Sequence, residues 1–143
     1  MPDVKEQINE VGLELTSRGI LYEYIDTLDK PAVAMAFGGG DYSFQNIAIT
    51  VGFDDDGESA QIVSSPIANV PDAKTAKLLM ILNQCNRDFR WATFYLDEDN
   101  DVSADADVVF GEHDAGFSVV EAVMLAASVI DDAYPEIMKG IWG

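Results

Sequence analysis

Residue types on which covalent and metal chemistry depend are scarce in this sequence. Its 143 residues include one cysteine, Cys85, and one histidine, His113. A single cysteine cannot form an intramolecular disulfide, so we expect a reducing compartment, the cytoplasm. A metal site built from several histidines of one chain is excluded, and we expect no metal and no other cofactor.

Basic residues are also few. The chain has 8 Lys and Arg against 26 Asp and Glu, which gives a net charge of −18. A nucleic-acid backbone would be repelled by this charge, and the sequence contains no basic stripe that could bind one. Anionic membrane surfaces are disfavoured for the same reason. We therefore expect neither nucleic acid nor a membrane among the partners.

Long apolar runs are absent as well. The N-terminus has neither a basic region nor an apolar segment, so we expect no signal peptide. The apolar run near the C-terminus is far shorter than the roughly 20 residues that a membrane span needs. Hydrophobic residues nevertheless make up 48% of the chain. This composition and length predict a single domain, residues 1–143, with a real core.

The stretch Leu78–Phe110 changes its hydrophobic period from helical to alternating. A helix is predicted by apolar residues at helical spacing: Leu78, Ile81, Leu82, Cys85 and Phe89. After it, Ala92, Phe94 and Leu96 alternate with Trp91, Thr93 and Tyr95. A second alternating run, 102–110, follows the acidic turn Asp97–Asp101. The stretch therefore predicts a helix followed by a β-hairpin.

The other elements follow from the same periods. Residues 3–17 form an amphipathic helix pattern, and strand patterns cover 20–26, 32–37, 46–53 and 58–65. Ser118 and Glu121 form a capping-box pattern that opens a last helix. The predicted order is α-β-β-β-β-α-β-β-α. Strand runs separated by helices indicate an α+β fold with an antiparallel sheet.

The last helix is apolar almost all round from Val119 to Ile130, interrupted only by Glu121 and Ser128. A helix without a polar face has to be covered on more than one side. One side can pack on the sheet, and the other then needs another chain or another helix. We predict a homodimer, with a candidate seam formed by Val119, Val123, Ala126, Ala127 and Ile130.

Two acidic turns could hold a cation. The segment from Asp97 to Asp105 has oxygen donors at several positions of a calcium-binding EF-hand loop. However, Val102 stands where that loop needs glycine, and Val108 stands where it needs a bidentate glutamate. A hairpin tip is the better interpretation here, and also for Asp54–Asp56, although weak cation binding at either turn stays open.

No catalytic constellation is present. A Ser-His-Asp triad would have to use His113, and the sequence has no nucleophile elbow of the form G-x-S-x-G. Cys85 lies on the apolar side of its helix, which favours a buried thiol over a nucleophile. Gly38–Gly40 lacks the Lys and Ser/Thr of a phosphate loop. We therefore predict no enzymatic activity and no catalytic residues.

Asn83 and Asn86 stand at the end of the central helix. They can bond backbone groups and set how the hairpin leaves the helix, or they can contact a ligand. The sequence around them resembles the YbjN family, described as sensory-transduction regulators with the fold of type III secretion chaperones. The resemblance rests on Val70-Pro71, on Leu82-Asn83-x-x-Asn86 and on Phe94-Tyr95-Leu96-Asp97 before an acidic turn. It implies protein partners.

These observations predict a non-enzymatic protein-binding module, chaperone-like or a regulatory adaptor, that acts as a homodimer with a protein or peptide partner. We expect partner contacts along exposed sheet edges or apolar patches, where a peptide can add as a strand. Two alternatives stay open: a calcium- or other cation-responsive sensor that uses the acidic turns, and a small enzyme.

Overall fold

The structure, a computed structural model, describes residues 3–26, 29–111 and 115–143 of the chain. Its elements follow the predicted order, with an additional short strand and a 3-10 turn before the second helix. In chain order they are α1 (Val4–Ser17), β1 (Glu23–Ile25), β2 (Ala32–Phe37), β3 (Ile47–Phe53), β4 (Ser59–Ser64), β5 (Ala68–Asn69), η1 (Asp72–Lys74), α2 (Thr75–Asp88), β6 (Thr93–Leu96), β7 (Asp101–Val109) and α3 (Ala115–Trp142).

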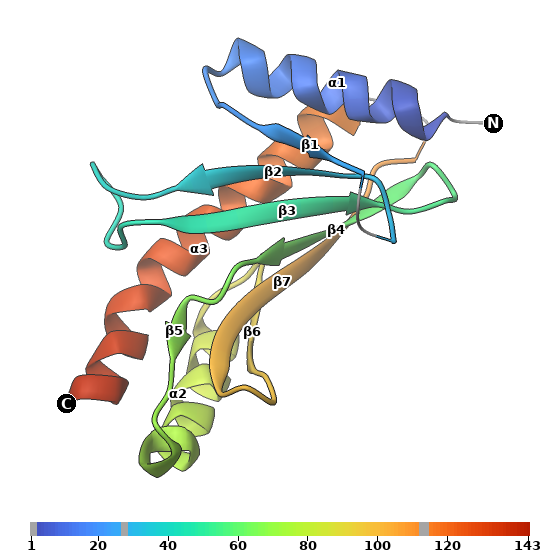
Figure 1. The fold of residues 1–143 in the computed structure, drawn as a ribbon. Coiled ribbons are helices and arrows are strands. Elements are labelled where there is room, and N and C mark those ends of the chain that lie inside the picture. The colour runs from blue at the N-terminus through green and yellow to red at the C-terminus, as the bar shows by residue number, and fades with distance from the viewer. Residues whose placement is uncertain (1–2, 27–28, 112–114) are drawn as a thin grey trace.

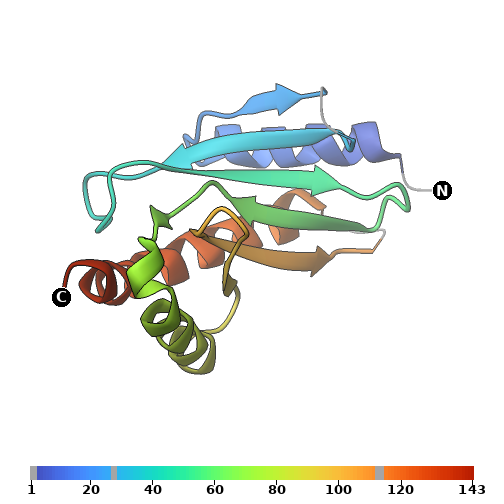
Figure 2. The same cartoon turned by 60° about the horizontal axis from the view of Figure 1, so that its bottom comes forward.

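The described strands form one antiparallel seven-stranded sheet. Its order is β1-β2-β3-β4-β7-β5, and β6 also pairs with β7. Val102 of β7 pairs with Ala68 of β5 and with Leu96 of β6, so β5 and β6 lie along opposite edges of β7. Helix α3 runs behind the strands in Figure 1, and Figure 2 shows α1 on the same side of the sheet as α3. Helix α2 lies at the end of the sheet beside β6 (Figure 2). The predicted α+β class with an antiparallel sheet is confirmed.

Alternation along the strands gives the sheet two different faces. The inward residues of β3 are Ile47, Ile49, Val51 and Phe53, all buried beneath the helices. The residues between them face the side that no described helix covers, which we call the open face. One row across the open face runs through Ala34, Thr50, Val63 and Asp105. This row passes from small side chains to an acidic one at β7.

Helix α3 is covered by its own chain, which corrects the predicted dimer seam. It packs against α1, α2 and β7. The seam residues are between 0% and 3% exposed within a single chain: Val119, Val123, Ala126, Ala127 and Ile130. Another helix was the alternative to a second chain as the further cover of α3, and here α1 and α2 supply that cover. These side chains therefore belong to the core and are not available to a second copy.

Helix α3 also continues through Pro135, although proline inside a helix usually kinks or breaks it. Proline has no backbone N–H, so the carbonyl of the residue four positions earlier, Asp131, loses its helical partner. The Ser43 hydroxyl donates to that carbonyl oxygen at 2.9 Å, and the Ser43 N–H donates to the Asp131 carboxylate. The loop between β2 and β3 thus supplies the bond that the helix lacks.

The predicted capping box at Ser118 is not formed. Helix α3 already begins at Ala115, so Ser118 lies inside it. The Glu121 carboxylate instead accepts a hydrogen bond from Arg18 at 2.7 Å, and Arg18 also pairs with Glu14 of α1 at 2.7 Å. Glu121 therefore joins α3 to the end of α1.

Candidate functional site

The chain leaves α2 abruptly. The Phe89 N–H donates to the Cys85 carbonyl at 2.9 Å, and Phe89 itself is extended. Trp91 has a φ of 77°, in the left-handed region that bulky residues rarely adopt. This conformation turns the chain before it joins the sheet. The alternation predicts a strand that begins at Trp91. Strand β6 instead begins at Thr93.

Asn86 ties the end of α2 to β6. Its Nδ2 donates to the Phe94 carbonyl oxygen at 3.0 Å, and its Oδ1 accepts from the Phe94 N–H at 2.8 Å. In an antiparallel strand both backbone groups of a residue point to the same edge. One side-chain amide therefore satisfies the outer edge of β6 at Phe94. Asn83 is exposed and makes no side-chain hydrogen bond within the described residues.

Strand β7 is longer than its partner β6. Thr93, the first residue of β6, pairs with Asp105, whereas β4 pairs with β7 as far as Val109. On the β6 side, the segment Ala106–Val109 has no strand partner among the described residues. We call this segment the free edge.

Hydrogen bonds around β7 show which backbone groups the free edge presents. The N–H groups of Ala104 and Phe110 donate to Ser64 Oγ and to the Glu58 carbonyl, both at 2.9 Å and both on the β4 side. Successive residues of a strand direct their N–H and C=O groups to opposite edges. The backbone groups of Asp107 and Val109 therefore point away from β4, out of the free edge.

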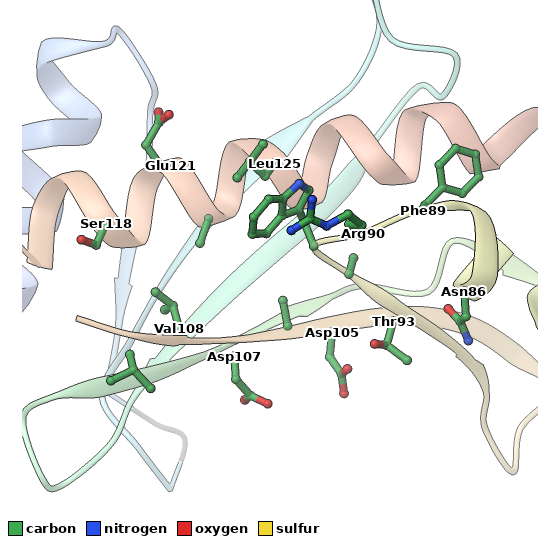
Figure 3. A pocket seen from close by; sticks show the side chains of 15 residues that line it. Asn86, Phe89, Arg90, Thr93, Asp105, Asp107, Val108, Ser118, Glu121 and Leu125 are labelled. Carbon is green, nitrogen blue, oxygen red and sulfur yellow. The ribbon is translucent and has the colours of Figure 1, made fainter. Parts of the chain in front are cut away.

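A cleft of about 630 Å³ lies between the free edge, the α2–β6 connection and α3 (Figure 3). We call it the β7 cleft. Its lining is Asn86, Phe89, Arg90, Trp91, Ala92, Thr93, Asp105, Ala106, Asp107, Val108, Val109, Ser118, Glu121, Ala122 and Leu125. The cleft exists because the chain turns at Trp91 and leaves empty the place that a longer β6 would occupy.

The two sides of the cleft differ in chemistry. Val108 points toward α3, where Leu125 adds an apolar side chain (Figure 3). Asp105 and Asp107 point the other way, onto the open face (Figure 3). Burial raises the pKa of the Asp105 carboxyl, and the charge of Asp107 raises it further. The cleft is thus apolar toward α3 and acidic toward the open face.

Arg90 is the basic residue of the cleft lining, and it stacks on its neighbour. Its guanidinium carbon lies 4.6 Å from the centre of the Trp91 ring, within the range of a cation–π contact. Among the described residues, the ion pairs join Arg18 to Glu14 and Glu121, and Lys30 to Asp54. Arg90, Asp105 and Asp107 do not belong to one of these pairs.

The acidic turns use their carboxylates as turn caps. Asp97 Oδ1 accepts from the N–H groups of Asp99 and Asp101, both at 2.9 Å. Asp54 binds Lys30 and the Ser59 hydroxyl, and Lys30 lowers the pKa of that carboxyl. Within the described ranges, no group of three or more His, Cys, Asp and Glu side chains could hold a metal ion. The geometry supports the hairpin-tip interpretation of both turns.

The candidate nucleophile Cys85 is buried in the core. Burial raises the pKa of its thiol, and the charges of Glu136 and Asp88 act in the same direction. A protonated, enclosed thiol does not suit nucleophilic chemistry. His113 lies outside the described residues. None of the described helices combines the length and the apolar character needed to cross a membrane.

A second exposed surface lies on α2, on the side turned away from the core. Met80 is 76% exposed and Leu79 is 54% exposed. Ala76, Asn83 and Arg87 follow on the same side at helical spacing and are also exposed. We call these residues the outer face of α2. It joins Asn83, one of the two asparagines singled out in the sequence, to a short apolar stripe.

The sequence does not predict the β7 cleft. Most of its lining residues belong to strand alternation or to helix surface in the sequence pattern. One signal was available, namely that the alternating run 102–110 is longer than the run 91–96 with which it pairs. The far end of the longer run therefore has no partner in the hairpin. The positive φ of Trp91, which opens the space, has no signature in the sequence.

Comparison with known proteins identifies relatives. A family model, YbjN, described as "Putative bacterial sensory transduction regulator", matches residues 13–139. No curated protein matches the sequence. Among solved structures, "Crystal structure of YbjN, a putative transcription regulator from E. coli" is similar, with a TM-score of 0.57 and 15% sequence identity over 90% of this chain and 92% of that chain. At this identity the similarity concerns the fold. Because the family model spans most of the chain, the protein belongs to the YbjN family.

Proposed function

We propose that this chain is a non-enzymatic regulatory module of the cytoplasm that binds an extended segment of a partner protein as an additional strand along β7. The observation that carries the proposal is the free edge, Ala106–Val109, which borders the β7 cleft. An unpaired edge offers a row of backbone donors and acceptors, and recognition by strand addition uses such a row.

The free edge has the length of a short strand. A β-residue advances the chain by about 3.4 Å, so a segment of about four residues would cover the free edge. Backbone bonds to Asp107 and Val109 would supply affinity, and side chains directed at Val108 and Leu125 would supply selectivity. The volume of 630 Å³ leaves room for those side chains.

The contrast with β6 supports the same conclusion. Exposed strand edges are commonly blocked by proline, by lysine or by a covering side chain. The outer edge of β6 is blocked at Phe94 by the Asn86 amide. The free edge of β7 contains neither proline nor lysine. It is therefore open to an incoming strand, whereas its neighbour is not.

We also propose that the chain forms a homodimer whose interface is the outer face of α2. Met80 and Leu79 are exposed there, whereas the candidate seam residues of α3 are buried. Apolar side chains that stand out on one helix face are typical of surfaces that meet another protein. A chaperone-like or adaptor role would then combine a self-association surface on α2 with a peptide site on β7.

The test is selection of random eight-residue peptides against the whole chain, followed by measurement of the selected peptides on Val109→Pro and Val109→Ala. Val109→Pro removes an N–H that points into the cleft and leaves the β4 ladder intact. Val109→Ala keeps that N–H and is the matched control. We expect Val109→Pro alone to lose binding, and the Asp107 and Val109 amides to become protected from hydrogen exchange when peptide is bound. Equal binding by both variants would contradict the proposal.

A further inference from the structure

A strand added along β7 would present its two faces to different surroundings. Side chains of a strand alternate between the two sides of a sheet. On one side they would meet Val108, Leu125 and the stacked pair of Arg90 and Trp91. On the other side they would lie beside Asp105 and Asp107 on the open face (Figure 3).

Asp105 and Asp107 of β7 are carboxylates without a cationic partner. Neither takes part in an ion pair of the described residues. Arg90 cannot serve, because it lies on the α3 side of β7 whereas both carboxylates point away from α3 (Figure 3). The charge of Asp107 adds to burial in raising the pKa of Asp105, as expected of like charges on one strand face.

We infer that the occupant of the β7 cleft is an extended segment of another protein in which Lys or Arg alternates with apolar residues. This inference rests on the proposed function. The basic side chains would pair with Asp107 directly across the added strand and with Asp105 along the diagonal. The apolar side chains would pack toward Val108 and Leu125. Arg90 would repel a basic side chain on the α3 side. Basic residues of the segment are therefore favoured only on the side of Asp105 and Asp107.

A second copy of this chain does not fit the cleft. Pairing two free edges would bring Asp105 and Asp107 of each copy together, in a protein of net charge −18. No stretch of the sequence carries Lys or Arg at alternate positions either. The segment therefore has to come from a partner of opposite charge.

The test uses synthetic peptides with blocked ends and a fluorescent label: KVKVKVKV, TVTVTVTV, EVEVEVEV and the block isomer KKKKVVVV. Anisotropy gives their affinities for the whole chain. We expect KVKVKVKV to bind about tenfold tighter than TVTVTVTV, since two cross-strand charge pairs are gained. EVEVEVEV should not bind, and KKKKVVVV should bind more weakly than KVKVKVKV because it lacks the alternation.

Variants separate local pairing from general attraction to an acidic protein. Asp105→Asn combined with Asp107→Asn should abolish the preference for KVKVKVKV. Glu98→Gln combined with Asp99→Asn removes the same charge from the other end of the hairpin and should keep the preference. Equal loss in both double variants would overturn the inference. Equal cleft binding of TVTVTVTV and KVKVKVKV would overturn it while leaving strand addition intact, whereas no binding by any peptide would overturn both.

Discussion

The Ser43 hydroxyl donates its hydrogen bond to the backbone carbonyl of Asp131, the group that Pro135 leaves without a helical partner. The distance is 2.9 Å, and a second bond joins the Ser43 N–H to the Asp131 carboxylate. A proline inside a helix normally kinks it, because a hydrogen bond is lost and the ring crowds the preceding turn. Here a loop side chain supplies the missing donor, and α3 runs on to Trp142.

We expect Ser43→Ala to lower the free energy of unfolding by about 1 kcal/mol, because it removes the donor to that carbonyl. In the Pro135→Ala background the helix regains its own N–H donor, so Ser43→Ala should cost less there. Chemical denaturation of the four proteins of this double-mutant cycle measures the difference. Ser128→Ala, at an exposed position of the same helix, is the control. A coupling energy of zero would mean that serine and proline act independently.

Asn86→Ala should destabilise the protein by about 1–3 kcal/mol, because it leaves both backbone groups of Phe94 without their partner. Asn86→Asp should also destabilise, since a carboxylate cannot donate to the Phe94 carbonyl. Asn83→Ala is the matched control and should change stability by less than about 0.5 kcal/mol, as expected for an exposed residue. Thermal and urea unfolding would show these effects. Similar losses for both asparagines would contradict the role given to Asn86.

Glutamate substitutions distinguish the core of α3 from the outer face of α2. Ala126→Glu places a charge at a position that is 3% exposed, and we expect it to unfold the chain at a cost of more than about 3 kcal/mol. Met80→Glu should leave the circular dichroism spectrum unchanged and convert a dimer to a monomer in sedimentation equilibrium. Ser128→Glu adds the same charge at an exposed position of α3 and should change neither. If Ala126→Glu stayed folded and became monomeric, the dimer interface would lie on α3 and not on the outer face of α2.

The stability of Asp105→Asn should depend on pH in a defined direction. Burial and Asp107 raise the pKa of Asp105 in the folded chain, so the folded state holds this proton more tightly than the unfolded chain does, whose ordinary value is 3.8. The carboxylate therefore costs stability above the folded pKa, and the cost vanishes below 3.8. Asp105→Asn should be more stable than the natural chain at neutral pH, with a gain that shrinks as the pH falls toward 3.

Urea unfolding at several pH values measures this gain. Asp107→Asn should give a smaller gain in the same direction, because it removes only the second cause of the raised pKa. A gain for Asp105→Asn that stays constant down to pH 3 would show that the carboxylate carries no such cost.

Much of the fold could be predicted because its causes are local. The alternation of β3 and the helical spacing of Leu78, Leu82 and Cys85 each express which side of an element is buried. The predicted seam failed for a related reason. Apolar residues around α3 show that it is covered on several sides, but they do not show by what. Here α1 and α2 do the covering, and both belong to the same chain.

The site was less predictable. Asn86 could be singled out, but its partner Phe94 is reached across the helix–strand exit, and that geometry depends on the left-handed Trp91. The free edge of β7 depends on a difference in length between two paired strands. Neither feature is contained in the period of any single segment.

The sequence by itself determined the type and order of the elements and the strong negative charge, because side-chain period, turn residues and charge are properties of the chain before it folds. Only the tertiary structure decided that α3 is enclosed, that Ser43 compensates for Pro135, and that β7 keeps an unpaired edge beside two aspartates. Each of those features requires segments far apart in the sequence to meet. Hydrogen bonds and burial between such segments arise only when the chain is folded.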